Sequence, residues 1–470
     1  MAQVKLQFFS AQFRIESQGN SELEQSMKDF RSIFSGKKIT VMGLGLLGRG
    51  LNDTLFLLKC GARVTVTDLK SREQLAASLE KLEDLPVEIR VGGHDPADFI
   101  NCDMILRNAD VPKSSPFLDL AKEKGIPVEM DESLFCKNFR GLVIGITGTR
   151  GKTTTTELIY RILSHAKRNV FLAGNIMGLA TLPLLEQAGD DDIVVLELSS
   201  WQLQGFHDAK ISPRASVFTN IYPDHLNRYA DMEEYIWDKK AIYRYQKDGD
   251  FCLFNGDQVA TKILANEAPA GKDLFSFVDS PSDLALRIPG EHNVSNVAAA
   301  WRLSTRLGIP DDIVRRAVES FEGVEHRIET VGAKNGVTFI NDSTSTTPIA
   351  GIMALNAVQA RRIFLLAGGA DKKLDLKTFA QAAALKAHKI ALLDGTATSR
   401  LQSDLLSFGA GSKIIGVFDD LRKAVLTVFG QASSGDAILL SPGCASFGMF
   451  NNEFHRGDCF KDIVKEIISK

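Results

Sequence analysis

The chain has few of the features that mark secreted, membrane-spanning or nucleic-acid-binding proteins. Only six of its 470 residues are cysteine, and none of them forms a CxxC pair or another spacing typical of metal ligands. No apolar run is long enough to span a bilayer, and the first residues lack a signal-peptide pattern. The 55 basic and 58 acidic residues leave a net charge of −3, which does not indicate a nucleic-acid partner. We therefore expect a cytoplasmic protein with reduced thiols.

The length and composition predict several α/β domains. A chain of 470 residues exceeds one ordinary domain, and 44% apolar with 24% charged residues is typical of globular proteins. Strand-like apolar runs alternate with helical stretches, which predicts mostly parallel sheets. We expect an N-terminal arm at 1–35 and domains at 36–138, 139–324 and 325–470.

The most informative stretch lies near the middle of the chain. An apolar strand at 142–146 runs into Thr147-Gly148-Thr149-Arg150-Gly151-Lys152-Thr153-Thr154, and an amphipathic helix follows. Glycines let backbone N–H groups point at phosphate oxygens, and the helix N-terminus adds partial positive charge. Lys152 would reach the β- and γ-phosphates and Thr153 the Mg²⁺. Although a strict GxxxxGK[ST] pattern needs glycine where Ile146 stands, we predict ATP or GTP binding rather than a simple glycine turn.

A second glycine loop lies near the start of the chain. Gly43-Leu44-Gly45-Leu46-Leu47-Gly48 follows an apolar strand, and the next strand ends at Asp68. This spacing is the dinucleotide-fold fingerprint. It fits NAD, but it also fits another ribose diphosphate such as a UDP group, and the glycines can serve packing alone.

Polar residues follow two predicted strands of the middle region. Glu197 ends the strand at 193–196, where a carboxylate beside a phosphate loop usually holds Mg²⁺. His225 follows the strand at 215–220, and it fits either a metal ligand or an ordinary loop histidine.

Two further pairs have ordinary explanations from the residues alone. Lys239 and Lys240 lie in a predicted helix, where a solvated charged face is the simpler interpretation. Asn293 and Asn296 precede an apolar helix, and Asx residues at a helix start are common caps.

Jointly these motifs resemble one family, the muramoyl amino-acid ligases. The similarity covers about residues 37–470, and its start, length and ending are most similar to the D-glutamate-adding members of that family. The motifs recur in the family's order: the Gly-Lys-Thr loop within Thr147–Thr156, Leu196-Glu197-Leu198-Ser199-Ser200, Asp224-His225, Glu325-His326-Arg327, Asn341-Asp342-Ser343, Leu440-Ser441-Pro442, Ala445-Ser446-Phe447 and Arg456-Gly457.

The resemblance implies a fold and a reaction. The fold would comprise a Rossmann-like UDP-binding domain, a central P-loop ATPase-like parallel sheet and a C-terminal Rossmann-like domain. The reaction would be ADP-forming ligation of D-glutamate to UDP-N-acetylmuramoyl-L-alanine through an acyl phosphate, in peptidoglycan precursor synthesis. It would use ATP and two Mg²⁺ ions. We expect a monomer with no nucleic-acid partner and no membrane insertion.

The resemblance also assigns site residues by position. The catalytic set is Lys152, Glu197, His225 and Lys239. The metal ligands would be Thr153, Glu197, His225 and Lys239 as a carbamate formed from bicarbonate. ATP would contact Gly148, Thr149, Arg150, Gly151, Lys152, Thr153, Thr154, Asn293, Asn296, Arg327 and Asp342. The UDP substrate would contact Gly45, Leu46, Leu47, Asp68, Leu69, Lys70, Asn175, Ser199 and His225. The amino acid would contact Lys372, Ser446, Phe447 and Thr346.

The carbamylated lysine of the family is carried over to Lys239 rather than to its neighbour. Tyr235, Lys239, Ile242 and Tyr243 keep the family's spacing, and Lys240 does not. Carbamylation turns a cation into an anion that can position Mg²⁺, and it requires an unprotonated amine.

The chain departs from the family pattern at several positions. Arg150 replaces the usual asparagine of the phosphate loop, and Arg107-Asn108-Ala109-Asp110 replaces the usual Ser-Pro-Gly of the UDP-binding domain. Thr344 stands where a lysine is frequent, and Glu453 where an aromatic residue commonly covers D-glutamate.

Three alternatives remain open on the sequence. The first is another muramoyl ligase or a folylpolyglutamate-type ligase with a different acceptor. The second is an NAD-dependent oxidoreductase built on Gly43–Asp68, which would leave Lys152, Glu197 and Asp342 unexplained. The third is a P-loop binding module that performs no chemistry.

Overall fold

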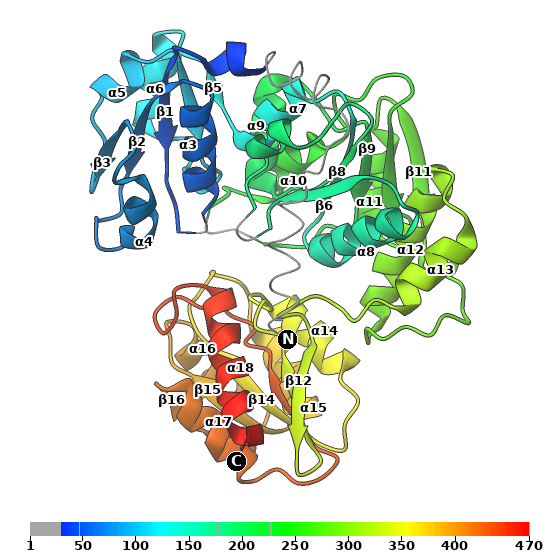
Figure 1. Ribbon diagram of the computed structural model, residues 1–470. Helices are drawn as coiled ribbons and strands as arrows, with labels where there is room; N and C mark the ends of the chain where they lie inside the picture. The colour runs from blue at the N-terminus through cyan, green and yellow to red at the C-terminus, as the bar shows by residue number, and fades with distance from the viewer. Residues whose placement is uncertain (1–29, 47, 177–178, 225–227, 470) are drawn as a thin grey trace. The chain divides into compact units, whose positions relative to one another are not determined.

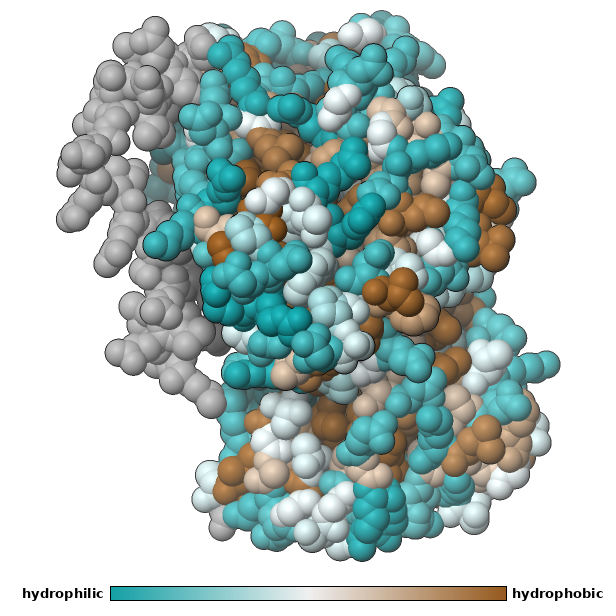
Figure 2. Space-filling view, turned by 90° about the vertical axis from the view of Figure 1, so that its right-hand side faces the viewer, coloured by the Kyte–Doolittle hydropathy of each residue, from teal (hydrophilic) through white to brown (hydrophobic). Residues whose placement is uncertain are grey.

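The structure is a computed structural model that describes residues 30–46, 48–176, 179–224 and 228–469 (Figure 1). The chain forms two compact units. The first contains residues 30–142 together with 179–192, and the second contains 143–176 and 193–469. No helix among the described residues is both long and apolar enough to cross a bilayer. On the face drawn in Figure 2, apolar side chains lie in small groups among polar ones.

The first unit is built on a five-stranded parallel sheet. Its strands in spatial order are β3 (Val87–Val91), β2 (Arg63–Asp68), β1 (Lys38–Met42), β4 (Met104–Arg107) and β5 (Val128–Glu129). The connecting helices are α3 (Arg49–Lys59), α4 (Ala76–Leu79), η2 (Glu80–Leu82), α5 (Ala97–Ile100), α6 (Pro116–Glu123) and α7 (Asp131–Asn138). The strand order reverses between β1 and β4, which is where doubly wound sheets bind ligands.

A segment from later in the chain completes the first unit. Residues 179–192, which include the short helix η3 (Leu182–Glu186), pack on α3 and α7. The Asp131 carboxylate accepts the backbone N–H groups of Thr181 at 3.0 Å and Leu182 at 2.6 Å. Lys59 forms an ion pair with Glu186 at 2.6 Å. The sequence pattern does not signal this excursion.

The second unit begins with a six-stranded sheet. In spatial order its strands are β11 (Gly271–Phe275), β10 (Phe251–Asn255), β9 (Ala215–Phe218), β6 (Leu142–Thr147), β8 (Ile193–Glu197) and β7 (Val170–Gly174). Its helices are α8 (Lys152–His165), α9 (Ser200–Ala209), α10 (Met232–Lys240), α11 (Val259–Asn266), η4 (Phe277–Asp279), α12 (Glu291–Arg306) and α13 (Asp311–Glu319). The phosphate loop joins β6 to α8, as the sequence predicts.

A second sheet of six strands fills the C-terminal part. In spatial order its strands are β12 (Glu329–Lys334), β13 (Val337–Asn341), β17 (Ala437–Leu440), β14 (Ile363–Gly368), β15 (Ala387–Leu393) and β16 (Ile414–Phe418). Only β12 runs antiparallel to its neighbour, and it lies at an edge. The helices are α14 (Pro348–Ala357), α15 (Lys377–Lys386), α16 (Thr398–Ser407), η5 (Gly411–Lys413), α17 (Leu421–Phe429) and α18 (Glu453–Ser469).

Buried apolar side chains cover both faces of the C-terminal sheet. Helices α14, α15 and α16 pack on one face around Phe379 and Leu401. Helices α17 and α18 pack on the other around Val425 and Phe460. Because both faces are covered, the strands read as continuous apolar runs, and polar residues gather at their carboxyl ends. The predicted α/β architecture with three mostly parallel sheets is confirmed.

Candidate active site

The loop after β6 has the backbone of a phosphate-binding loop. Gly151 lies in the left-handed region with φ 79°, and α8 begins at the next residue. Gly148 has φ 147°, and a Cβ atom there would collide with the Thr219 hydroxyl. Glycine is therefore needed at both positions. The first N–H groups of α8 have no intrahelical partner, and they carry the positive end of the helix dipole.

Two cations lie directly at this loop. Lys152 Nζ donates to the carbonyl oxygens of Gly148 at 3.1 Å and Thr149 at 3.3 Å. Burial lowers the pKa of Lys152 to about 8, although the nearby Glu197 carboxylate opposes the shift. Arg327 donates from Nη2 to the Thr153 hydroxyl at 2.8 Å. Positive charge is thus concentrated where the sequence predicts a triphosphate.

Glu197 offers a free ligand atom beside these cations. It ends β8 and is 2% exposed. Its Oε1 accepts from the Asn175 amide at 3.0 Å, while Oε2 is buried and has no hydrogen-bond partner among the described residues. A buried carboxylate oxygen without a donor is costly unless a cation or water completes it. Carboxylate and hydroxyl oxygens are the ligands that Mg²⁺ prefers, so Glu197 and Thr153 fit that ion.

Lys239 is buried and points at the phosphate loop. It is 1% exposed, and its Nζ lies 3.0 Å from the Gly148 carbonyl oxygen and 3.4 Å from the Thr147 hydroxyl. Burial, and then the charge of Lys152, hold the pKa of Lys239 well below its usual range. Lys240 instead forms an ion pair with Glu267 at 2.6 Å. The solvated-face interpretation is therefore wrong for Lys239.

Two residues outside the predicted set join the site. Asp224 is 3% exposed and lies 3.5 Å from Arg150 Nη2 and 3.9 Å from Lys372 Nζ. The Tyr235 hydroxyl lies 3.1 Å from the Thr149 hydroxyl. The only sequence signal for Asp224 was its place next to His225, which itself lies outside the described residues.

Asn293 and Asn296 lie inside α12 and do not cap it. The helix begins at Glu291 after Gly290, with no side-chain cap. The Asn296 amide donates to Asn293 Oδ1 at 3.1 Å, and its Oδ1 accepts from the Thr155 hydroxyl at 3.4 Å. The capping interpretation is wrong, and Asn296 faces α8 directly beyond the phosphate loop.

Apart from Arg327, which precedes β12, the predicted C-terminal residues lie on loops at the carboxyl ends of β13, β14 and β17. Asp342 accepts from the hydroxyls of Ser345 at 2.5 Å and Ser441 at 2.7 Å, and burial raises the pKa of its carboxyl to about 6. Lys372 donates to the Thr346 hydroxyl at 3.1 Å.

In the loop after β17, a buried serine is followed by an exposed phenylalanine. Ser446 is 3% exposed, and its hydroxyl is buried without a hydrogen-bond partner among the described residues. Phe447 is 62% exposed. Ser446 therefore presents a polar atom that a ligand can satisfy.

In the first unit, Asp68 holds the glycine loop together. Its carboxylate accepts the N–H groups of Gly45 at 3.0 Å and Lys70 at 2.9 Å. Leu46 and Leu69 are exposed. The predicted Leu47 lies outside the described residues.

Ser199 is the N-cap of α9. Its hydroxyl accepts the Gln202 N–H at the start of α9, and the Gln202 side chain accepts the Ser199 N–H at 2.8 Å. The two residues form a capping box. A contact of Ser199 with the UDP substrate stays a prediction.

The departures from the family pattern also have structural partners. Arg107 is buried and donates to the Val111 carbonyl oxygen at 3.1 Å. The Asn108 amide donates to the Gly43 carbonyl oxygen at 3.2 Å and so supports the glycine loop. Thr344 donates to the His326 carbonyl oxygen at 2.8 Å.

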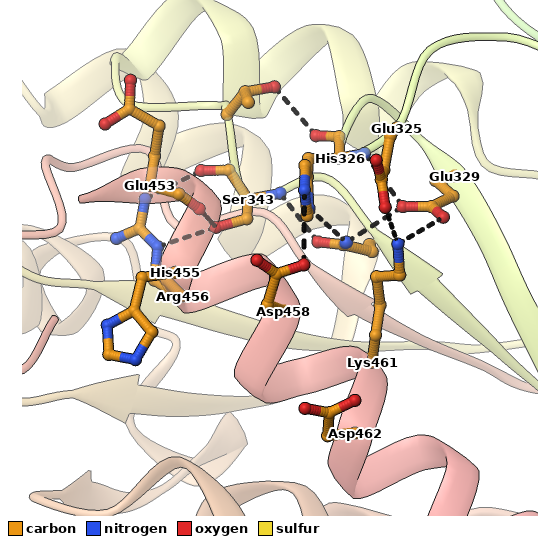
Figure 3. A network of polar contacts seen from close by, with 12 residues as sticks. Glu325, His326, Glu329, Ser343, Glu453, His455, Arg456, Asp458, Lys461 and Asp462 are labelled. Atoms are coloured by element: carbon orange, nitrogen blue, oxygen red, sulfur yellow. Dashed lines mark hydrogen bonds and ion pairs between the residues drawn. The ribbon is translucent and has the colours of Figure 1, made fainter. Parts of the chain in front are cut away.

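A second group of side chains, two acids and a histidine, has the composition of a metal site (Figure 3). Glu325, His326 and Asp458 bring their ligand atoms close together. However, the Lys461 ammonium already pairs with Glu325 and, at 3.3 Å, with Glu329. This group therefore attaches α18 to the segment before β12.

Comparison with family models covers most of the chain. Residues 37–129 match the model described as Mur ligase MurD-like, N-terminal domain. Residues 146–278 match the Mur ligase middle domain, and residues 326–444 match the Mur ligase, glutamate ligase domain.

Relatives and solved structures agree with these matches. A protein of Roseiflexus sp. (strain RS-1) named UDP-N-acetylmuramoylalanine--D-glutamate ligase is 38% identical, over 92% of this chain and 99% of its own length. A protein of the same name from Clostridium botulinum (strain Kyoto / Type A2) is 32% identical, over 95% and 100%. The crystal structure of UDP-N-acetylmuramate-alanine ligase MurC from Thermotoga maritima has a similar fold, with TM-score 0.62, 19% identity, and 92% and 100% coverage.

Proposed function

The chain belongs to the Mur ligase family, and on that premise we propose that it joins D-glutamate to UDP-N-acetylmuramoyl-L-alanine at the expense of ATP. The substrate carboxylate attacks the γ-phosphorus and ADP leaves, which gives an acyl phosphate. The amine of D-glutamate then attacks the acyl carbon, loses a proton, and displaces phosphate. The names of the relatives from Roseiflexus and Clostridium botulinum support this choice of substrates.

One observation carries the proposal: Lys152, Arg327 and a buried Glu197 oxygen without a hydrogen-bond partner among the described residues lie together at the phosphate loop. The first step brings two anions together, so it needs concentrated positive charge. Lys152 is suited to neutralise the transferring phosphoryl group, and Arg327 lies at Thr153 in the first turn of α8. An oxidoreductase would have no use for this arrangement.

Thr153 and Glu197 would hold a Mg²⁺ ion. When bound, the ion supplies Lewis-acid stabilisation of the charge that develops on the phosphoryl oxygens. The orphaned Oε2 of Glu197 supports this assignment. We place His225 at a second ion from the family resemblance alone.

Lys239 is proposed to be carbamylated by bicarbonate-derived CO₂. The reaction joins the neutral amine nitrogen to the carbon and releases one proton. Support comes from the burial of Lys239 and from its lowered pKa, which increases the share of unprotonated amine relative to an ordinary lysine.

The remaining residues would bind and orient the substrates. Asn293, Asn296 and Asp342 would contact ATP, and Lys372, Thr346 and Ser446 would hold D-glutamate, with Lys372 pairing a carboxylate. The glycine loop with Asp68 would hold the UDP group, and Asn175 the muramoyl part. We further propose a monomer that acts in the cytoplasm, where ATP is available.

The test is ATP-dependent phosphate release with Mg²⁺ and UDP-N-acetylmuramoyl-L-alanine, against D-glutamate, L-glutamate, L-lysine and meso-diaminopimelate. We expect release with D-glutamate alone. Release with another amino acid would keep the mechanism and change the acceptor. Binding of ATP without release in any mixture would contradict the proposal, and tight NADH binding would favour the oxidoreductase alternative.

A further inference from the structure

Arg456 is a fully buried arginine with an unusual set of partners. It lies in α18 and is 0% exposed. Among the residues that the structure describes, no carboxylate lies in ion-pair contact with its guanidinium (Figure 3). Burial lowers the pKa of Arg456 to about 10, and the charge of Glu453 opposes that shift. A buried charge with no carboxylate in direct contact is costly, so its hydrogen bonds must offset much of that cost.

Every hydrogen bond of the guanidinium goes to one of two loops at the carboxyl ends of strands. In the loop after β13, Nε donates to the Ser343 hydroxyl at 3.0 Å and Nη2 to the Ser343 carbonyl oxygen at 2.8 Å. In the loop after β17, the Cys444 carbonyl oxygen accepts at 3.3 Å and that of Ala445 also at 3.3 Å. The planar fork of arginine suits this task because its N–H groups point in fixed directions.

The Ala445 carbonyl also reaches a third loop. It accepts the N–H of Ala370 at 2.9 Å, and the Ala445 N–H donates to the Ala370 carbonyl oxygen at 3.1 Å. A Cβ atom on Gly369 would collide with the same carbonyl oxygen. Arg456 thereby supports the point from which both Ser446 and Lys372 project.

We infer that Arg456 is a positioning residue for the acceptor amino acid, because it fixes the three loops that carry Ser446, Thr346 and Lys372. This inference rests on the proposed function. Arg456 has no free face toward a ligand, so it acts through these loops and does not bind the amino acid. Residues on a rigid support hold a substrate in the reactive geometry, and a small displacement costs much of that advantage.

The test is Arg456→Lys, which keeps the charge and loses the fork. We expect KM for D-glutamate to rise about tenfold while KM for ATP changes much less. Arg422→Lys is the matched control, since Arg422 of α17 pairs with Glu466 of α18 at 2.7 Å on the protein surface. It should leave both constants as in the wild type.

A milder variant covers the case in which Arg456→Lys does not fold. Ser343→Ala removes one acceptor and leaves the guanidinium in place, and a several-fold rise in KM for D-glutamate alone is expected. Equal rises for ATP and D-glutamate, or an unchanged KM for D-glutamate in a folded variant, would overturn the inference. Failure of the wild type to use D-glutamate would instead refute the proposed function.

Discussion

The side-chain nitrogen of Lys239 lies 3.0 Å from the carbonyl oxygen of Gly148, so a lysine from α10 contacts the phosphate loop. Lys152, at the start of α8, donates to the same carbonyl oxygen at 3.1 Å. Two lysines sharing one acceptor repel each other when both are charged. One of them is therefore favoured in the neutral form, and the deeper burial of Lys239 makes it the stronger candidate.

Lys239→Ala should abolish most ligase activity, because it removes the amine on which a carbamate forms. Lys240→Ala should leave activity close to the wild type, since within the described part of the chain its ammonium pairs with Glu267 and not with the phosphate loop. Steady-state phosphate release measures both. In addition, wild-type activity should fall when bicarbonate is stripped and return when it is restored. Full activity of Lys239→Ala would contradict the carbamate.

Lys152→Met should lose ATP turnover and yet gain stability. The pKa of Lys152 is about 8 in the folded protein, against 10.5 ordinarily. Below pH 8 the lysine is charged in both states, so its burial cost is fully present; between pH 8 and 10.5 the folded state loses its proton first, and stability rises with pH. Part of the side chain is exposed, and water screens some of the cost.

We therefore expect the free energy of unfolding of Lys152→Met to exceed that of the wild type by roughly 1–3 kcal/mol at neutral pH. Denaturant unfolding at several pH values tests this, and the difference should shrink above pH 8. A variant less stable than the wild type at neutral pH would show that the lysine's hydrogen bonds outweigh its desolvation.

Asp342 should give ATP use a pH dependence. Burial raises its pKa to about 6 from 3.8, so the carboxylate is lost as the pH falls through about 6. If the ionised form binds ATP, KM for ATP should rise below that pH. Asp342→Asn should have a high KM for ATP that does not change with pH. Ser345→Ala removes a hydroxyl that lowers the pKa and should move the rise to higher pH. A flat wild-type profile across pH 6 would exclude Asp342 from this role.

The raised pKa of Asp342 also makes stability depend on pH, in the direction opposite to that of an acid whose pKa is lowered by an ion pair. Between pH 3.8 and 6 the unfolded chain ionises Asp342 first, so this carboxyl's contribution to stability falls as the pH rises through that window. Asp342→Asn should remove that slope in unfolding measurements.

Gly148→Ala should disrupt nucleotide binding. A methyl group there would meet the Thr219 hydroxyl, and φ of 147° is strained for alanine. We expect ATP affinity, measured by calorimetry, to fall at least about tenfold. Gly93→Ala is the control, because nothing lies near that position and its φ is ordinary. Equal ATP binding by the two variants would mean that the phosphate loop can shift to accommodate the added methyl group.

The sequence predicted the parts of the fold that bury continuous apolar runs. The strands at 142–146, 193–196 and 215–220 are confirmed within one or two residues. The edge strand β12 (Glu329–Lys334) was not predicted, since Glu-Thr-Val-Gly-Ala-Lys has no apolar run and forms a strand only by pairing with β13.

The residues of the candidate site likewise fall into those that a local pattern predicts and those that depend on distant contacts. Lys152, Thr153 and Glu197 follow from local motifs, because loop, helix start and strand end are all local features. Asp224 lies near Lys372, and Arg456 donates to Ser343. Both partners are far away in the sequence, and no local pattern encodes such contacts. The helical pattern placed Lys239 on a helix but could not tell which of two adjacent lysines points inward.

Because residues 179–192 belong to the first unit, that unit is built from two separate stretches of the sequence. A fragment ending at Leu142 would lack η3, leaving the Asp131 carboxylate without its two backbone donors and Lys59 without Glu186. It would also uncover the sides of α3 and α7 on which η3 packs. Such a fragment should be poorly soluble, whereas a fusion that adds back residues 179–192 through a short linker restores the missing piece. Recombination between relatives should accordingly exchange the two stretches together.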